Sequence, residues 1–376
     1  PDEIQTIPAG EEKAQTPDKR ITSFDIAPPE KSVRQATALI KKSKRPVIIV
    51  GHGARFNMPA IIYFAEMLNA PVLTTFKAKG QISDSHSLAG GVLGRSGTPV
   101  ASHFMNESDL LIVLGASFSN HTGITDKKPT IQVDFDPLAL AKFHKVDVQV
   151  FGELSVSVDV LNKELSGKTN TVDQTGEIAG RWNIWRNEKE KRLNEYRKKG
   201  LGAIHVFDAL NRFAPENAVM TVDVGNNAYS FGRYYESKNN TFLMSGYLGS
   251  IGFALPAAMG AWAAVGNKRP VVAVAGDGGL CQYLAEITTL VKYKMPVKVI
   301  VLNNNELAKI SKEQRSGNFE VWQTALVNPD FAVYAESCGA LGLKVSKCDQ
   351  LDDAMQKLFS HPGPALLEIA TDPALL

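Results

Sequence analysis

Residues 271–306, VVAVAGDGGLCQYLAEITTLVKYKMPVKVIVLNNNE, decide the fold of this chain. The β-branched run Val271–Ala275 predicts a buried strand ending in a glycine-rich turn, and Leu280–Lys292 predicts the helix that follows. A second strand is predicted over Val297–Leu302, and three asparagines follow it. Parallel strands joined by a helix bring their carboxyl ends to one edge of a sheet, where α/β folds bind ligands.

Two polar side chains stand at these predicted strand ends. Asn304 lies 27 positions after Asp277. One carboxylate and one amide oxygen suit a hard Mg²⁺ ion that takes its other oxygens from a diphosphate, water and a backbone carbonyl. Gly278 and Gly279 let the backbone approach an anion and direct N–H groups at it. We therefore predict a site for Mg²⁺ and a diphosphate; a plain turn and an asparagine-rich loop would leave the spacing unexplained.

Length and composition are those of a globular protein with more than one domain. The chain has 376 residues, of which 44% are hydrophobic and 21% charged. A net charge of +2 favours no polyanionic partner, so we expect no binding of nucleic acid. Three cysteines without CxxC spacing are typical of a reducing compartment, which predicts a cytoplasmic protein. No apolar run is long enough for an integral membrane segment.

The pattern of strands and helices divides the chain into four segments. Residues 1–29 are polar and proline-rich and are predicted to be a linker from a missing N-terminal domain. Residues 30–165 and 201–376 alternate strands and helices, which predicts an α/β protein of two doubly wound parallel-sheet domains. Residues 166–200 are predicted to be a linker and a charged helix, Arg181–Lys199, that carries two tryptophans.

The elements expected within the two domains follow from apolar periodicity and turn residues. Besides those of the stretch quoted first, they are helices 30–43, 58–69, 203–213, 254–265, 330–338 and 351–359, and strands 46–50, 72–75, 110–114, 130–135, 219–222, 341–345 and 365–370.

The stretch quoted first resembles the thiamine diphosphate motif, in which GDG and NN follow consecutive strands. The resemblance extends over most of the chain through VDFDPLALAKFHKVDV, VDVGNNAYSFGRYY, GYLGSIGFALPAAMGA and VLNNNELAKISKEQ. The chain is thus similar to the group of 2-oxo acid enzymes that contains pyruvate oxidases, quinone-linked pyruvate dehydrogenases and acetolactate synthases. This resemblance implies a central Rossmann-like domain and a domain that binds thiamine diphosphate and Mg²⁺.

The resemblance assigns roles around the metal. Asp277 and Asn304 would bind Mg²⁺ through their side chains, and Glu306 would bind it through its backbone oxygen. Gly278 and Gly279 would donate N–H groups to the diphosphate.

The resemblance also assigns roles in two earlier turns. The turn of Gly225, Asn226 and Asn227 would contact the same phosphates. Gly249 would accept a hydrogen from the 4′-amino group of the cofactor. Ile251 would hold the cofactor in a bent shape that brings this group against C2 of the thiazolium, so that proton removal becomes intramolecular. Seen without the resemblance, Ile251 is a core residue.

Two residues bear on the choice between oxidase and carboligase. Glu313 matches a glutamate of the pyruvate oxidases, where acetolactate synthases carry tryptophan, and would make polar contacts or handle protons near the substrate. The alternative is a surface glutamate beside Lys312. Lys309 departs from the oxidases, which carry an aromatic residue between thiazolium and flavin, and this counts against fast electron transfer to FAD.

The central domain raises the question of FAD. Its strand-end turns match the flavin-contacting segments of the group, and carboxylates near the end of the domain would accept ribose hydroxyls. The residues so assigned are Gly51, Gly53, Ala54, Arg55, Thr74, Thr75, Lys77, Gly94, Arg95, Gly115, Ser117, Phe118, Asp134, Asp136 and Asp147. Decarboxylases of the group keep this domain without flavin, so the fold alone does not decide the matter.

These observations predict part of a thiamine diphosphate- and Mg²⁺-dependent enzyme that decarboxylates a 2-oxo acid, expected to be pyruvate, and oxidises the hydroxyethyl intermediate through FAD. The alternatives are an acetolactate synthase-like carboligase, a non-oxidative decarboxylase, or a noncatalytic split or scaffold subunit. An NAD-dependent dehydrogenase is disfavoured because GxGxxG follows neither opening strand.

The expected partner is a pyrimidine-binding domain of the same or another subunit, within a homodimer or homotetramer. The opening residues Pro1–Gln5 resemble the exit from such a domain. We expect the fragment alone to be inactive.

Overall fold

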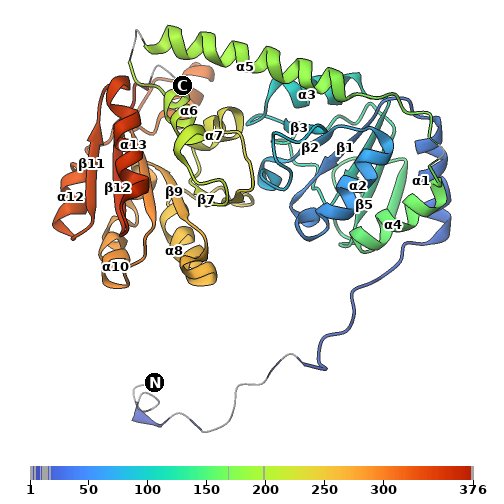
Figure 1. The fold of residues 1–376 in the computed structure, drawn as a ribbon, viewed down its shortest axis with the longest axis horizontal. Coiled ribbons are helices and arrows are strands. Elements are labelled where there is room, and N and C mark those ends of the chain that lie inside the picture. The colour runs from blue at the N-terminus through green and yellow to red at the C-terminus, as the bar shows by residue number, and fades with distance from the viewer. Residues whose placement is uncertain are drawn as a thin grey trace.

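The computed structural model describes residues 18–167, 169–197 and 200–373, together with positions 3, 6–8, 10 and 16. The predicted linker, residues 1–29, lies partly outside these ranges, and its described part from residue 18 onward contains no helix or strand. Two α/β domains follow, and a long helix runs past both of them (Figure 1). The predicted fold class, two doubly wound parallel sheets, is confirmed.

The central domain is built on a six-stranded sheet in the order β3-β2-β1-β4-β5-β6, with every pair parallel. Its two central strands are buried along their whole length, as expected for apolar strands covered by helices on both faces. The strands are β1 (Pro46–Val50), β2 (Val72–Thr74), β3 (Ala89–Val92), β4 (Leu110–Leu114), β5 (Thr130–Asp134) and β6 (Val148–Phe151). The helices are α1 (Glu30–Lys42), α2 (Met58–Leu68), α3 (Pro99–Glu107) and α4 (Leu154–Leu165), with 3₁₀ turns η2 (His52–Phe56) and η3 (Phe76–Ala78).

The C-terminal domain repeats this architecture in the order β11-β12-β10-β9-β7-β8, again with parallel pairs. Its strands are β7 (Val219–Val222), β8 (Thr241–Leu243), β9 (Val271–Gly276), β10 (Lys298–Asn303), β11 (Leu341–Val345) and β12 (Ala365–Ala370). Its helices are α6 (Ala203–Phe213), α7 (Asn226–Tyr234), α8 (Ala254–Val265), α9 (Asp277–Cys281), α10 (Ile287–Lys292), α11 (Ala308–Ser316), α12 (Phe331–Ser337) and α13 (Leu351–Ser360), with 3₁₀ turns η4 (Gly266–Lys268), η5 (Leu284–Glu286) and η6 (Cys348–Gln350).

Alternate residues of the C-terminal strands supply two separate cores, because successive side chains of a strand point to opposite faces. Val272, Val274 and Ile300 pack in the cluster that contains the residues of α6 and α13. Val271, Ala273 and Val299 pack in the cluster beneath α8 and α10. The sheet is therefore covered on both faces, and only its edges and strand ends remain for a site.

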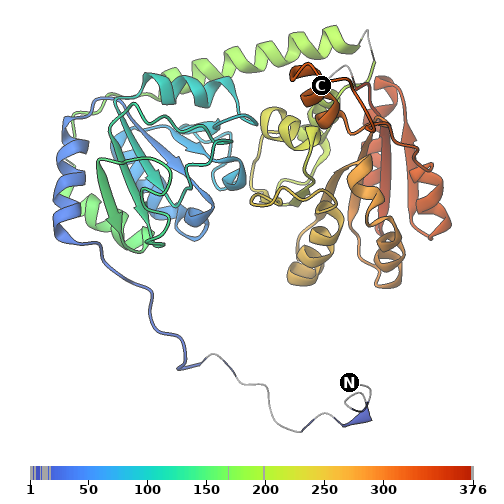
Figure 2. The same ribbon diagram turned by 180° about the vertical axis from the view of Figure 1, so that it is seen from behind.

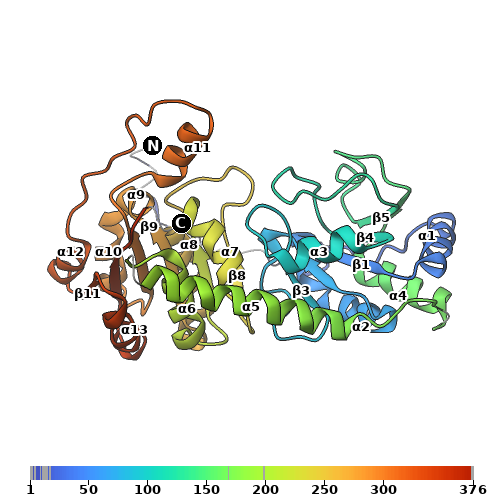
Figure 3. The same cartoon turned by 90° about the horizontal axis from the view of Figure 1, so that it is seen from above.

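Helix α5 (Thr175–Arg197) runs along both domains, as the views from behind and from above show (Figures 2 and 3). It is charged, as the sequence predicts, but its two tryptophans are buried. The indole of Trp182 donates to the carbonyl of Ala89 at 2.7 Å, and Arg186 pairs with Glu236 of the C-terminal domain at 2.8 Å. The helix thus fixes one domain to the other. The predicted end of this helix, Lys199, lies outside the described residues.

The prediction of one helix over Leu280–Lys292 is wrong, because this segment is divided among α9, η5 and α10. The break falls at Gln282 and Tyr283, where Gly252 packs against both side chains. A Cβ atom at Gly252 would lie 2.7 Å from the Tyr283 ring, and Gly252 has a φ of +84°. The loop that crosses here carries the predicted residues Gly249 and Ile251. Within the described ranges, no helix has both the length and the apolar character needed to cross a bilayer.

A buried ion pair of the central domain lies against the C-terminal domain. The side chains of Lys79 and Asp84 are 3% and 8% exposed, and Nζ lies 3.1 Å from Oδ2. The same carboxylate oxygen accepts the backbone N–H of Ser237 at 2.7 Å, and Nζ lies 6.0 Å from the centre of the Tyr235 ring. Two central-domain residues therefore depend on two from the C-terminal domain for their environment.

Replacing Asp84 by alanine should lower the free energy of unfolding by about 3–5 kcal/mol, because it leaves the Lys79 ammonium buried without its counterion. The matched control is Asp353→Ala, which removes an exposed pair with Lys357 and should cost less than about 1 kcal/mol. Urea unfolding measures both. Equal losses in the two variants would show that the buried pair contributes no more to stability than an exposed one.

Candidate functional site

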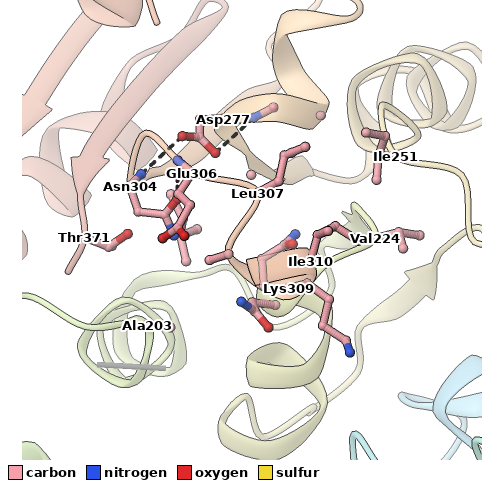
Figure 4. A pocket seen from close by; sticks show the side chains of 18 of the residues that line it. Ala203, Val224, Ile251, Asp277, Asn304, Glu306, Leu307, Lys309, Ile310 and Thr371 are labelled. Atoms are coloured by element: carbon pink, nitrogen blue, oxygen red, sulfur yellow. Dashed lines mark hydrogen bonds between the residues drawn. The ribbon is translucent and has the colours of Figure 1, made fainter. Parts of the chain in front are cut away.

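A cavity of about 270 Å³ opens at the carboxyl edge of the C-terminal sheet (Figure 4). It lies where the strand order reverses, between β7 and β9, which is the usual ligand site of a doubly wound sheet. The structure brings ten of the predicted residues into its lining. They are Gly225, Asn226, Asn227, Gly249, Ile251, Asp277, Gly278, Gly279, Asn304 and Glu306.

Asp277, which directly follows β9, ties this strand end to that of β10. Its Oδ2 atom accepts the backbone N–H groups of Asn304 at 3.3 Å and Asn305 at 2.8 Å, and the side-chain amide of Asn328 at 2.8 Å. Its Oδ1 atom accepts the N–H of Gly278 at 2.9 Å. An ionised carboxylate offers about four lone-pair positions. Oδ2 is therefore saturated, and Oδ1 keeps capacity for another ligand.

The backbone turns sharply after Asn304. The Asn304 Oδ1 atom accepts the N–H of Glu306 at 3.1 Å, and Asn305 adopts a φ of +56°. Glu306 then pairs in antiparallel fashion with Ala325. In the close view, Asp277, Asn304 and Glu306 lie together at one end of the cavity (Figure 4).

The oxygen ligands that the site offers fit a magnesium ion only in part. The described residues contain no group of three or more His, Cys, Asp or Glu side chains able to hold a metal. Asp277 and Asn304 supply two oxygens, whereas Mg²⁺ is octahedral and usually takes further oxygens from phosphates and water. The site therefore fits Mg²⁺ that arrives with an anionic ligand.

A second feature fits an anion. The side-chain Nδ2 atom of Asn226 is buried at the cavity, and no hydrogen-bond partner for it exists among the described residues. A buried donor without a partner is costly, and a phosphate oxygen would satisfy it. The neighbouring Asn227 instead turns its Nδ2 inward to the carbonyl of Asp223 at 3.0 Å, so its side chain supports the turn.

Asp223 is a site residue that the sequence analysis missed. It is 1% exposed, and burial raises its pKa to about 6. Its carboxylate accepts N–H groups from Val224 at 2.8 Å, Gly252 at 3.1 Å and Phe253 at 3.2 Å. It thereby fastens the loop that carries Ile251 to the end of β7. The available signal was an aspartate directly after a buried strand, the same pattern that identified Asp277.

Packing adds a reason for the two glycines after Asp277. A Cβ atom at Gly279 would lie 2.2 Å from Asp223 Oδ2, and one at Gly278 would lie 2.8 Å from Leu307. Gly279 therefore needs to be glycine whether or not an anion is bound, whereas a side chain at Gly278 would require only that the end of the Leu307 side chain shift. Burial also raises the pKa of the Asp277 carboxyl, an effect that its N–H donors partly offset.

Three further predictions concern Ile251, Glu313 and Lys309. Ile251 is 38% exposed at the cavity, so it is not a core residue. Glu313 pairs with Lys309, and the cavity lining in the described part of the chain includes Lys309 but not Glu313. The Lys309 side chain points away from Asp277 in Figure 4, and its Nζ lies 5.2 Å from the centre of the Tyr229 ring.

At the carboxyl edge of the central sheet, the predicted flavin turn is closed by its own backbone. The N–H of Gly53 donates to the carbonyl of Gly115 at 2.9 Å, and a Cβ atom at Gly51 would lie 2.1 Å from the same oxygen. Direct contact between the two loops accounts for these glycines without any flavin.

The other residues assigned to FAD divide between the two edges of the sheet. Those at or beyond the carboxyl ends of β1 to β5 are Gly51, Gly53, Ala54, Arg55, Thr74, Thr75, Lys77, Gly94, Arg95, Gly115, Ser117, Phe118, Asp134 and Asp136. Asp147 precedes β6 and accepts the N–H of Thr130, the first residue of β5, at 2.8 Å. It lies at the opposite, amino edge, so its assignment to the same FAD site is wrong.

Comparison with known proteins matches both domains. Residues 33–161 match the thiamine pyrophosphate enzyme central domain, and residues 223–369 match the thiamine pyrophosphate enzyme C-terminal TPP binding domain. Thiamine pyrophosphate is another name for thiamine diphosphate. The chain belongs to the thiamine pyrophosphate enzyme family.

Individual relatives extend this result. The chain is 32% identical over 349 residues to the putative thiamine pyrophosphate-containing protein YdaP of Bacillus subtilis (strain 168), covering 92% of this chain and 60% of that protein. It is 29% identical over 376 residues to a probable acetolactate synthase large subunit of Methanococcus aeolicus, covering 92% of this chain and 61% of that protein. It is 30% identical over 367 residues to the chloroplastic acetolactate synthase 1 of Nicotiana tabacum, covering 91% and 53%. The chain therefore spans between about half and three fifths of the length of each of these relatives.

Gly279→Ala should destabilise the protein by about 1–3 kcal/mol, because the new methyl group overpacks the Asp223 carboxylate. Gly260→Ala, in α8, is the matched control: a Cβ atom there meets nothing within 4 Å, and alanine should stabilise the helix by up to about 1 kcal/mol. Melting temperatures compare the two variants. Equal melting temperatures would contradict the close contact between Gly279 and Asp223.

Asp223→Asn should flatten the pH dependence of stability. The folded-state pKa of Asp223 is raised from 3.8 to about 6, so its contribution to stability is present at low pH and is lost as the pH rises through about 6. Two units correspond to about 3 kcal/mol. Relative to wild type, the variant should therefore gain up to this amount between about pH 4 and pH 7 in urea unfolding. If the free energies of unfolding of the variant and the wild type change with pH in parallel, the pKa of Asp223 is not raised on folding.

Proposed function

We propose that this chain provides the Mg²⁺ and diphosphate side of a thiamine diphosphate-dependent 2-oxo acid enzyme, and that the reaction is carboligation of the acetolactate synthase kind. One observation carries the proposal: the open Oδ1 position of Asp277, the Asn304 side chain and the Asn226 donor, which has no partner among the described residues, line the same cavity. Oxygen ligands for a cation and an N–H donor for an anion meet there, as the binding of a metal diphosphate requires.

Carboligation is better supported than the flavin-linked oxidation expected from the sequence. The oxidase expectation depended on Glu313, which is ion-paired with Lys309 outside the cavity lining of the described chain. Two of the relatives named above carry the name acetolactate synthase. The glycines assigned to flavin are explained by contact between their own loops. Pyruvate stays the proposed first substrate.

Each residue has a limited task in this proposal. Asp277 and Asn304 would hold Mg²⁺ through side-chain oxygens, Glu306 through its backbone oxygen, and the Asn226 amide would donate to a phosphate oxygen. Ile251 would contact the body of the cofactor at the exposed end of the cavity. The cofactor, when bound, supplies the electron sink that stabilises the carbanion formed on loss of CO₂.

Partners are also proposals. Tyr247 and Leu248 are 92% and 82% exposed in the loop that carries Gly249, and large apolar side chains at a cavity mouth favour a covering protein surface. We propose that a pyrimidine-binding domain of the same or another subunit covers this side, within a cytoplasmic homodimer or homotetramer. A noncatalytic scaffold would have no use for the Asn226 donor, which lacks a partner in the described part of the chain.

The reaction can be tested with the purified full-length protein supplied with thiamine diphosphate, Mg²⁺ and pyruvate. We expect CO₂ release together with a coupled carbon–carbon product, detected by mass spectrometry, and no dependence on an electron acceptor. Hydrogen peroxide or a reduced quinone, with flavin absorption that bleaches on adding pyruvate, would overturn carboligation in favour of oxidation.

Asp277→Ala should weaken Mg²⁺-dependent binding of thiamine diphosphate at least about tenfold, because it removes a cation ligand together with three backbone contacts. Isothermal titration of the full-length protein measures this change. Asp353→Ala removes a surface carboxylate and should bind as wild type does. Unchanged binding by the Asp277 variant would refute the metal assignment.

A further inference from the structure

A row of hydrogen-bonded side chains leads from the interior of the C-terminal sheet to Asp277. The Asn303 Nδ2 atom, at the end of β10, donates to Glu368 Oε1 of β12 at 2.9 Å. The Asn328 Nδ2 atom, in the loop before α12, donates to Asn303 Oδ1 at 3.0 Å and to Asp277 Oδ2 at 2.8 Å. Four side chains from four segments thus form one connected row.

The two carboxylates at its ends fix the direction of both amides. An ionised carboxylate only accepts hydrogen bonds, so Asn303 must turn its nitrogen to Glu368 and its oxygen to Asn328. Asn328 must in turn present its nitrogen to both Asn303 and Asp277. Each amide has a single orientation that satisfies its neighbours.

Glu368 also fixes the segment from which Asn328 comes. It is 1% exposed, and its Oε2 atom accepts the N–H groups of Phe331 at 2.9 Å and Ala332 at 3.3 Å. These groups open α12, three residues beyond Asn328. One buried carboxylate therefore holds both the amide that orients Asn328 and the start of the helix that follows it.

We propose that Asn328, held by Asn303 and Glu368, is a positioning residue that fixes the Asp277 carboxylate with Oδ2 occupied and Oδ1 open to the cation. The inference rests on the proposed function in one respect, that the cation is Mg²⁺ bound with thiamine diphosphate. Without Asn328, Oδ2 would lose its one side-chain donor, and only two backbone N–H groups, one of them at 3.3 Å, would hold this oxygen away from the cation. Partners that orient a ligating carboxylate commonly change metal affinity 10- to 100-fold.

Metal affinity separates this role from simple support of the fold. Mn²⁺ serves as the probe, because its free form is counted directly by electron paramagnetic resonance. The full-length protein is titrated with Mn²⁺ at saturating thiamine diphosphate. The set comprises Asn328→Ala, Glu368→Gln, the double variant, and the control Asn217→Ala, which removes an exposed amide before β7 at the opposite edge of the sheet. Thermal melts of each variant report folding separately.

We expect Asn328→Ala to weaken Mn²⁺ binding about 10- to 100-fold, while Asn217→Ala leaves it unchanged. Glu368→Gln should also weaken binding, and the double variant should be no weaker than Asn328→Ala, because Glu368 acts through Asn328. Should Glu368→Gln fail to fold, Asn303→Ser replaces it in the cycle with the same expected outcome.

Two results would overturn the inference alone: wild-type affinity in Asn328→Ala, or effects of Asn328→Ala and Glu368→Gln that multiply. Lower melting temperatures with unchanged Mn²⁺ affinity would assign the row to the fold only. A wild-type protein that binds no Mn²⁺ in the presence of thiamine diphosphate would overturn the proposed function itself, and the positioning role with it.

Discussion

The Asp277 carboxylate holds the carboxyl ends of β9 and β10 together, and the site depends on this contact. Parallel strands leave their last N–H groups at one edge of the sheet, and Asp277 accepts two of them, from Asn304 and Asn305. The tight turn that follows directs Asn304 and Glu306 to the same cavity. Without the carboxylate, the Asn304 N–H would lose this acceptor, and the Asn305 N–H would keep only its longer bond to Asn303 Oδ1 at 3.2 Å.

The C-terminal sheet places a buried aspartate directly after each of two neighbouring strands. Asp223 after β7 and Asp277 after β9 are both buried, burial raises the pKa of each, and backbone N–H groups serve as their donors. N–H groups orient a carboxylate without neutralising its charge, whereas a lysine or arginine would cancel it. Asp277 thus keeps a net negative charge for a cation, while Asp223 fixes the loop on the other side of the cavity. The edge is organised before any ligand arrives, as a site of this kind requires.

Local pattern was sufficient for much of the fold. β1, β4, β7, β11 and β12 have the predicted bounds, because runs such as PVIIV and LLIVL are bounded by turn residues. β3 was missed, since two glycines interrupt its four residues. The break between α9 and α10 falls where Gly252, from a loop distant in sequence, packs against Gln282 and Tyr283. Asp277 and Asn304 were predicted because a motif places them. Asn328 and Glu368 were not, because Asn328 meets Asp277 across 51 positions and Glu368 meets Asn303 across 65. Asp147 was misplaced because spacing alone does not say which edge of a sheet a residue occupies.

We propose that one cation binds between the ends of β9 and β10. The most direct test is the anomalous scattering of Mn²⁺ in crystals of the full-length protein grown with thiamine diphosphate. We expect one peak at oxygen-coordination distance, about 2.0–2.4 Å, from Asp277 Oδ1, the Asn304 side-chain oxygen and the Glu306 carbonyl. A peak elsewhere, or bound thiamine diphosphate whose phosphates lie away from this cavity, would contradict it.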